Sequence, residues 1–148
     1  MGSFMKKSTL LVVAVMMLFS CAGKVPDNLG VKKRMLAECP GKKNCVNSQS
    51  TDKTFFIEAF KYEGTRDAAI RKLKKKIASF DRIVIAEESK NYLRYECKSA
   101  IMGFVDDLEF FFSEDNVIHI RSAARLGYFD FGVNRKRVER LRKLYYSQ

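Results

Sequence analysis

Four strand-like runs follow one another in the second half of the chain, and only short polar or glycine-containing segments separate them. The runs span residues 82–88, 92–100, 104–112 and 117–123, and they are rich in β-branched and aromatic side chains. The intervening segments contain SKN, MG and EDN. Connections this short join antiparallel neighbours, because parallel strands need a long crossover. This half of the chain therefore predicts an antiparallel sheet.

The last two runs also indicate their own register. If EDN is a three-residue loop, Phe110 lies opposite Ile120 on one face, and Glu109 lies opposite Arg121 on the other. A slip of one residue would instead place Glu109 against Ile120. The first register keeps apolar side chains together and pairs opposite charges. It also places Asp106 on the core face, where this carboxylate needs a partner.

Two helices complete the predicted fold. Residues 65–80 repeat apolar side chains at helical spacing, and Thr65 is a suitable N-cap. Residues 134–146 form a second amphipathic pattern, with Asn134 as the expected N-cap. Aromatic and β-branched residues over 54–62 predict one more strand before the first helix. The order is strand, helix, four strands, helix, so we predict an α+β fold with about five antiparallel strands and both helices on one face.

The N-terminus has the pattern of a bacterial export signal. Two lysines precede an apolar run from Leu10 to Phe19, which is shorter than the roughly 20 residues that a membrane span needs. The following LFSC resembles a lipobox, in which Cys21 receives the lipid. Two or more acyl chains anchor a protein stably. We therefore predict a signal peptide over 1–20, and Ala22 after the cysteine favours the outer membrane, facing the periplasm.

Export from the cytoplasm changes which partners the positive net charge indicates. A formal net charge of +11 ordinarily suggests nucleic acid or an anionic membrane as the partner. Outside the cytoplasm nucleic acid is not expected. The predicted partners are the membrane, through the acyl chains on Cys21, and an anionic small molecule or an envelope protein. The lysine-rich face of the first helix is a further candidate for membrane contact. A tether over 21–38 and a single domain over 39–148 complete the predicted organisation.

The remaining cysteines have two interpretations. Cys39 and Cys45 flank the turn PGKKN, which can bring them close enough for a disulfide in an oxidising compartment. Cys97, alone in a strand, then packs as a buried apolar side chain. The alternative joins these three cysteines and His119 in a zinc site, although their spacing is not that of a zinc knuckle. We favour the disulfide and expect no metal or other cofactor.

Three motifs resemble a known family. CPGKKNCVNS, GFVDDLEF and IRSAARLGYFDFGVNRKRVE occur in this order and are similar to the motifs of the DUF 1499 family, an uncharacterised family of unknown function. Asn47 and Ala124 depart from serines that the family usually has. The resemblance implies that the family's motif positions are Cys39, Cys45, Asp106, Asp107, Glu109, Arg121, Ser122, Arg125, Asp130, Asn134 and Arg135. It implies no mechanism.

The basic C-terminal motif has two possible roles. Arg121 and Arg125 can dock the terminal helix through buried bonds to Asp106 and Asp130, and we favour this interpretation. Alternatively, the two arginines and the N-terminus of the helix form a cationic pocket for a carboxylate or phosphate group. Together with Cys39 and Cys45, the candidate ligand or structural residues are Asp106, Asp107, Glu109, His119, Arg121, Ser122, Arg125, Asp130, Asn134 and Arg135.

The sequence contains no recognisable catalytic set. His119 is the only histidine, and no nucleophile elbow is present. Strand alternation sends Asp106 to one face and Asp107 and Glu109 to the other, so ion pairing with arginines is the favoured role of these carboxylates. We therefore predict a non-enzymatic binding or assembly module. The alternative is a hydrolase or metal-dependent enzyme that uses Asp107, Glu109 and His119 on an open polar sheet face.

Overall fold

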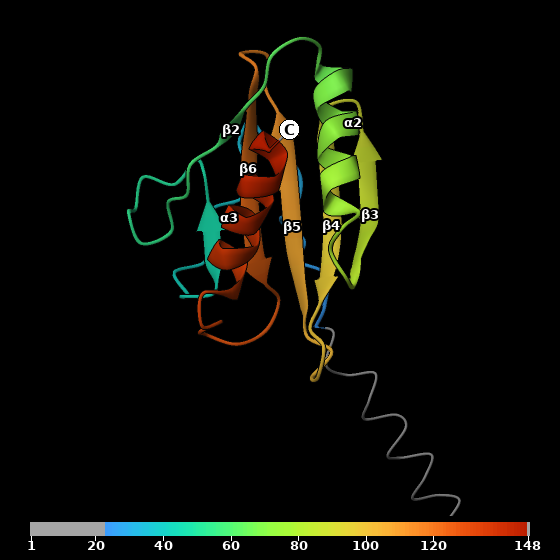
Figure 1. The fold of residues 1–148 in the computed structure, drawn as a ribbon. Coiled ribbons are helices and arrows are strands. Elements are labelled where there is room, and N and C mark those ends of the chain that lie inside the picture. The colour runs from blue at the N-terminus through green and yellow to red at the C-terminus, as the bar shows by residue number, and fades with distance from the viewer. Residues whose placement is uncertain (1–22, 148) are drawn as a thin grey trace, which may run out of the picture.

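The computed structural model describes residues 23–147, so the predicted signal peptide and Cys21 lie outside the described residues. The fold is α+β, with two helices on one face of a six-stranded antiparallel sheet (Figure 1). In chain order the elements are β1 (Cys45–Asn47), β2 (Phe60–Lys61), α2 (Arg66–Ile77), β3 (Ile83–Ser89), β4 (Tyr92–Lys98), β5 (Val105–Phe112), β6 (Val117–Ala124) and α3 (Val133–Tyr146). None of the described helices is long and apolar enough to cross a membrane.

The four predicted central strands and their register are confirmed. The strand order is β1-β6-β5-β4-β3, with β2 also paired to β6. Phe110 pairs with Ile120, and Glu109 pairs with Arg121. These two pairs lie on opposite faces because side chains alternate along a strand. The fold therefore has one apolar sheet face toward the helices and a second face that carries charged residues.

The edge of the sheet beside β6 differs from the prediction. Residues 54–62 contribute only the two-residue strand β2, and the residues CVN, which lie outside the predicted strands, form β1. The two strands share one edge, because β1 pairs with Arg121–Ala123 and β2 with Val117–Ile118. Ser48 fills the gap between them: its amide donates to the Ile120 carbonyl, and its hydroxyl accepts from the Ile120 amide, both at 2.8 Å.

The helices begin with different caps. Thr65 caps α2 as predicted, since its hydroxyl accepts from the Ala68 amide at 3.2 Å. The prediction of Asn134 as the cap of α3 is wrong, because the helix begins one residue earlier, after Gly132 in a left-handed conformation. Asp130 performs the capping instead: its carboxylate accepts from the amides of Gly132 at 2.9 Å and Asn134 at 2.8 Å.

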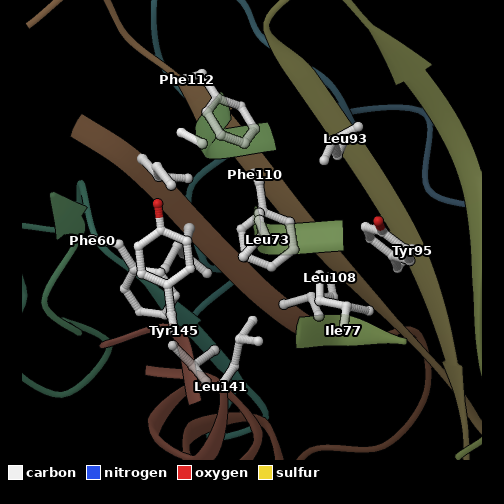
Figure 2. Packing of buried hydrophobic residues seen from close by; sticks show 14 of the residues in the cluster. Phe60, Leu73, Ile77, Leu93, Tyr95, Leu108, Phe110, Phe112, Leu141 and Tyr145 are labelled. Carbon is white, nitrogen blue, oxygen red and sulfur yellow. The ribbon is translucent and has the colours of Figure 1, made fainter. Parts of the chain in front are cut away.

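The main core lies between the helices and the apolar sheet face. Large side chains from β2, β4, β5 and both helices meet there (Figure 2): Phe60, Leu73, Ile77, Leu93, Tyr95, Leu108, Phe110, Phe112, Leu141 and Tyr145. Phe60 from β2 stacks on Tyr145 from α3, with ring centroids 5.3 Å apart. The terminal helix is therefore held by packing against the short edge strand as well as against the centre of the sheet.

The second sheet face is covered by the segment expected to be a tether. Residues 23–38 pass behind the sheet, on the side opposite the helices (blue in Figure 1). Leu36 is buried against Tyr92 and Phe111, with Val31 packed beside them. The Gly30 amide donates to Glu109 Oε1 at 2.9 Å. The described part of the expected tether thus belongs to the folded domain. Val31 and Leu36 pack against apolar side chains of this face, and the Gly30 amide binds a carboxylate there.

Truncation of Leu141, a core side chain of α3, tests the packing of this helix on the sheet. Leu141 is 1% exposed, so Leu141→Ala should lower the free energy of unfolding by about 2–5 kcal/mol. Leu144→Ala, at a half-buried position on the same helix, is the matched control and should cost clearly less. Urea unfolding followed by circular dichroism measures both. Equal losses would contradict the placement of α3.

Candidate functional site

A buried ion pair lies at the centre of the second sheet face. Arg121 Nη1 on β6 donates to Glu109 Oε2 on β5 at 2.7 Å, and the two side chains are 4% and 0% exposed. The other Glu109 oxygen accepts from the Gly30 amide and the Tyr92 hydroxyl, each at 2.9 Å. Burial, and then the Glu109 charge, raise the pKa of the Tyr92 phenol. Three donors therefore satisfy this carboxylate.

Asp107 holds a second set of ion pairs on the same face. Arg125 binds it with two nitrogens, Nε and Nη2, at 2.8 Å each, and Arg94 Nη1 lies 3.0 Å from Oδ1. Arg125 Nη2 also donates to Glu96 at 2.6 Å. Hydrogen bonding to Asp107 is the main cause that raises the pKa of Arg125. We call the six residues of these two sets the ion-pair network: Arg94, Glu96, Asp107, Glu109, Arg121 and Arg125.

The predicted bonds of the two motif arginines to Asp106 and Asp130 are wrong. Arg125 binds Asp107, and Arg121 binds Glu109, the pairing that the predicted strand register indicated. Strand alternation explains the difference, because Asp106 points to the helix side while both arginines point to the second face. The predicted ion pairing of Asp107 and Glu109 with arginines is confirmed. The open polar sheet face of the enzymatic alternative is not found among residues 23–147, because residues 23–38 cover this face and the carboxylates are buried.

A separate polar cluster fastens α3 to the helix side of the sheet. Asp106 on β5 accepts from Arg137 Nη2 at 2.7 Å, and Ser122 on β6 bonds Asn134 Oδ1 at 2.5 Å. Arg137 also donates to Asn134 Oδ1 at 2.6 Å. Burial raises the pKa of Asp106, while Arg137 opposes that shift. The sequence prediction missed Arg137, although it lies one helical turn after Asn134 and Asp106 required a cation on this face.

The other candidate residues have simpler surroundings. Arg135 donates to the Thr54 carbonyl at 3.1 Å. His119 stacks on Phe111, with ring centroids 5.9 Å apart, and partial burial lowers its pKa. Among the described residues His119 makes no hydrogen bond to Asp107 or Glu109. The three groups proposed for acid–base chemistry therefore do not form a hydrogen-bonded set in this conformation.

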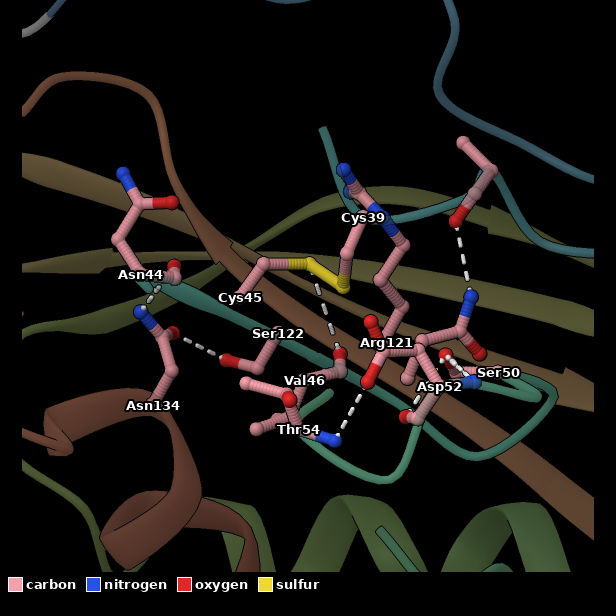
Figure 3. The surroundings of a disulfide bond; sticks show 12 residues. Cys39, Asn44, Cys45, Val46, Ser50, Asp52, Thr54, Arg121, Ser122 and Asn134 are labelled. Carbon is pink, nitrogen blue, oxygen red and sulfur yellow. Dashed lines mark hydrogen bonds between the residues drawn. A yellow bond between two sulfur atoms is a disulfide. The ribbon is translucent and has the colours of Figure 1, made fainter. Parts of the chain in front are cut away.

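The predicted disulfide is confirmed. Cys39 and Cys45 are bonded, with their Cα atoms 5.7 Å apart, and the bridge lies beside Val46 and Arg121 (Figure 3). Their sulfurs are thus unavailable to the alternative zinc site. Cys97 is a free, buried thiol, and burial raises its pKa to about 11. Over residues 23–147 no group of three histidine, cysteine or acidic side chains is placed to hold a metal ion.

Sequence reasoning also missed a cavity lined by cations. It has a volume of about 440 Å³ and lies where the N-terminal half of α3 meets β3, β4 and the end of the α2–β3 connection. We call it the basic cavity; its lining residues are Phe80, Asp81, Arg82, Ile83, Cys97, Lys98, Ser99, Ala100, Val133, Lys136, Arg137 and Arg140. Five of these are cationic and only Asp81 is acidic. Arg140 lies over the Phe80 ring, 4.6 Å from its centroid.

The family model of a protein of unknown function, DUF1499, matches residues 35–144. The chain belongs to the DUF1499 family. The match includes the ion-pair network, the cluster around Asn134, the disulfide and the basic cavity, and it leaves out Cys21 and Gly30. No curated protein matches the chain. Membership of DUF1499 agrees with the resemblance of the three motifs and adds no activity to it.

Neutralising Glu109 should be costly. Glu109→Gln leaves the Arg121 charge buried without a counter-ion, and loss of one partner of a buried pair costs about 3–5 kcal/mol of unfolding free energy. Glu114→Gln is the control, since Glu114 pairs with Arg34 in an exposed bridge whose side chains are 79% and 66% exposed. It should leave the urea midpoint nearly unchanged. Similar midpoints for both variants would argue against a buried charge at Arg121.

The single histidine predicts a pH dependence. Its pKa is lowered from 6.5 by desolvation, so protonation is harder in the folded than in the unfolded chain. The contribution of His119 to stability is therefore present above pH 6.5 and is lost as the pH falls through the lowered value. His119→Gln should remove this part of the decline. Proton NMR of the one imidazole gives the midpoint directly, and a midpoint above 6.5 would refute the assignment.

Proposed function

We propose that this DUF1499 protein is an envelope lipoprotein, anchored to the outer membrane through Cys21, whose domain binds an anionic group without catalysing a reaction. The lipobox-like LFSC and the apolar run before it support the anchor. The Cys39–Cys45 disulfide is consistent with an oxidising envelope compartment. The partners in this proposal are the membrane and an anionic small molecule or a protein that presents such a group.

The basic cavity carries the binding part of the proposal. The side chains of Lys98, Lys136 and Arg140 are exposed, so their positive charges are available to a ligand at the surface. Arg137 is held in place by Asp106 and Asn134, which orients one guanidinium at the cavity wall before any ligand arrives. Preorganised arginine favours carboxylate and phosphate groups, because its planar donors match their oxygens.

The cavity also favours a particular ligand shape. Phe80, Ile83 and Val133 give the cavity an apolar part, and five cationic side chains also line it. Ligand sites commonly combine an apolar lining with a few polar groups that fix orientation. The geometry thus fits a molecule with one anionic group and a short apolar portion better than a free ion.

The state of the sheet carboxylates supports a non-enzymatic role. A general base must accept a proton from its substrate, so its lone pairs have to be accessible. Asp107 and Glu109 are 1% and 0% exposed, and each accepts hydrogen bonds from arginine. The Cys97 thiol, with its pKa raised to about 11, is a poor nucleophile at neutral pH. These groups serve the fold in this proposal.

Charge reversal in the basic cavity tests the binding role. We expect Lys136→Glu/Arg140→Glu to weaken binding of an anionic amphiphile, short-chain phosphatidic acid or octanoate, by at least about tenfold, since one charge-assisted hydrogen bond contributes roughly 1.5–3 kcal/mol. The control is Arg71→Glu/Lys75→Glu, which makes the same charge change at the same i,i+4 spacing on the exposed face of α2. Titration calorimetry compares them. If both double variants weaken binding equally, the effect comes from the net charge of the protein, and a site in the basic cavity is contradicted.

A further inference from the structure

Apolar side chains are exposed together at one end of the sheet. The β4–β5 connection presents Ile101, Met102 and Phe104, which are 93%, 57% and 40% exposed, and the β6–α3 connection presents Tyr128, Phe129 and Phe131 at 63%, 54% and 78%. Both connections lie at the lower end of the sheet in Figure 1. We call this surface the loop end. Clustered exposed apolar residues mark an interaction surface.

The two connections start side by side. The Arg125 amide donates to the Val105 carbonyl at 3.1 Å, so the last residues of β6 lie against the first residues of β5. Phe129 and Phe131 contact each other, with ring centroids 4.9 Å apart. Phe131 also has a positive φ of 56°, which is unfavourable for a bulky residue. This ring is nevertheless 78% exposed and packs on Phe129 instead of entering the core.

Basic residues border the loop end. Lys43 pairs with Phe129 in a parallel bridge, which brings the disulfide loop and its exposed Lys42 to this surface. Lys136 on the first turn of α3 donates to the Phe131 carbonyl at 3.2 Å. Lys98 reaches the basic cavity next to the β4–β5 connection. Aromatic and aliphatic tips within a basic border are typical of surfaces that bind the interface of an anionic membrane.

The start of the described chain lies at the same place. A methyl group on Gly23 would be 3.0 Å from Arg125 Cβ and 3.1 Å from Leu126 Cγ, so this glycine contacts the base of the β6–α3 connection. Cys21 is two residues earlier, and two residues span at most about 7 Å. An acyl anchor on Cys21 would therefore hold this end, and no other, against the bilayer.

We infer that the loop end is a membrane-docking surface, with Phe131, Tyr128 and Ile101 in the lipid interface and the neighbouring lysines at anionic headgroups. The inference rests on the proposed anchor, because that anchor is what would bring the loop end to the bilayer. Residues 23–38 are bound to the second face, so no free tether separates residue 23 from the sheet. The inference also orients the domain on the membrane. Lys98 and Val133, which lie next to the two connections, line the basic cavity, so this cavity opens near the headgroups.

The absence of tryptophan from the sequence allows a direct test. The full chain, purified from bacterial membranes and reconstituted in phosphatidylglycerol-containing vesicles, carries one reporter at a time. Phe131→Trp and Met102→Trp report on the two connections of the loop end. Tyr146→Trp is the control, since Tyr146 is a 53% exposed aromatic residue at the opposite end of α3. Lipids brominated on the acyl chains quench a tryptophan only where it enters the bilayer.

We expect at least about twofold quenching and a blue-shifted emission for Phe131→Trp and Met102→Trp, and neither change for Tyr146→Trp. Equal behaviour of the three variants, whether all quenched or none, overturns the docking surface. A partner protein in place of the membrane would also leave all three unquenched. Mass spectrometry of the same samples tests the anchor separately: an unmodified Cys21 refutes the lipoprotein proposal, and an acylated Cys21 with no quenching refutes the docking surface alone.

Discussion

The fold depends on a charge pair in the centre of its sheet. Glu109 and Arg121 lie directly opposite each other on β5 and β6, and both side chains are buried. Burial of two charges is costly unless geometry and additional hydrogen bonds compensate. The Gly30 amide and the Tyr92 hydroxyl supply those bonds to Glu109. A sheet built around this pair therefore requires a covering segment on its second face, and residues 23–38 provide it.

That requirement fixes where the chain enters the domain. With residues 23–38 bound across the second face, Gly23 comes to lie beside Arg125 and Leu126, at the end of the sheet where the apolar connections are exposed. The same arrangement seals Asp107 and Glu109 from substrates. The two surfaces that carry our proposals, the basic cavity and the loop end, border each other through Lys98 and Val133. Membrane anchoring and anion binding thus become properties of one end of the molecule in our proposal.

The sequence predicted the parts of this structure that follow from local patterns. Alternation and short turns gave the four central strands, their register and the Thr65 cap, because these depend on neighbours close in sequence. The partners of Arg125 and Asp106 were not predictable in the same way, since Arg137 and Glu96 reach them from other elements. The segment 21–38 was expected to be a tether because its apolar residues, Val31 and Leu36 among them, follow no helical or strand period. Their burial depends on Tyr92 and Phe111, which lie far along the chain.

Amide hydrogen exchange of residues 23–38 shows whether this segment is part of the folded domain and covers the buried Glu109–Arg121 pair. We expect the Gly30 amide, which donates to a buried carboxylate, to exchange far more slowly than an unstructured peptide amide, and Glu109→Gln to accelerate its exchange. If residues 23–38 exchange at the rate of an unstructured peptide while the β5 amides stay protected, the second face is open and these residues do not cover the Glu109–Arg121 pair.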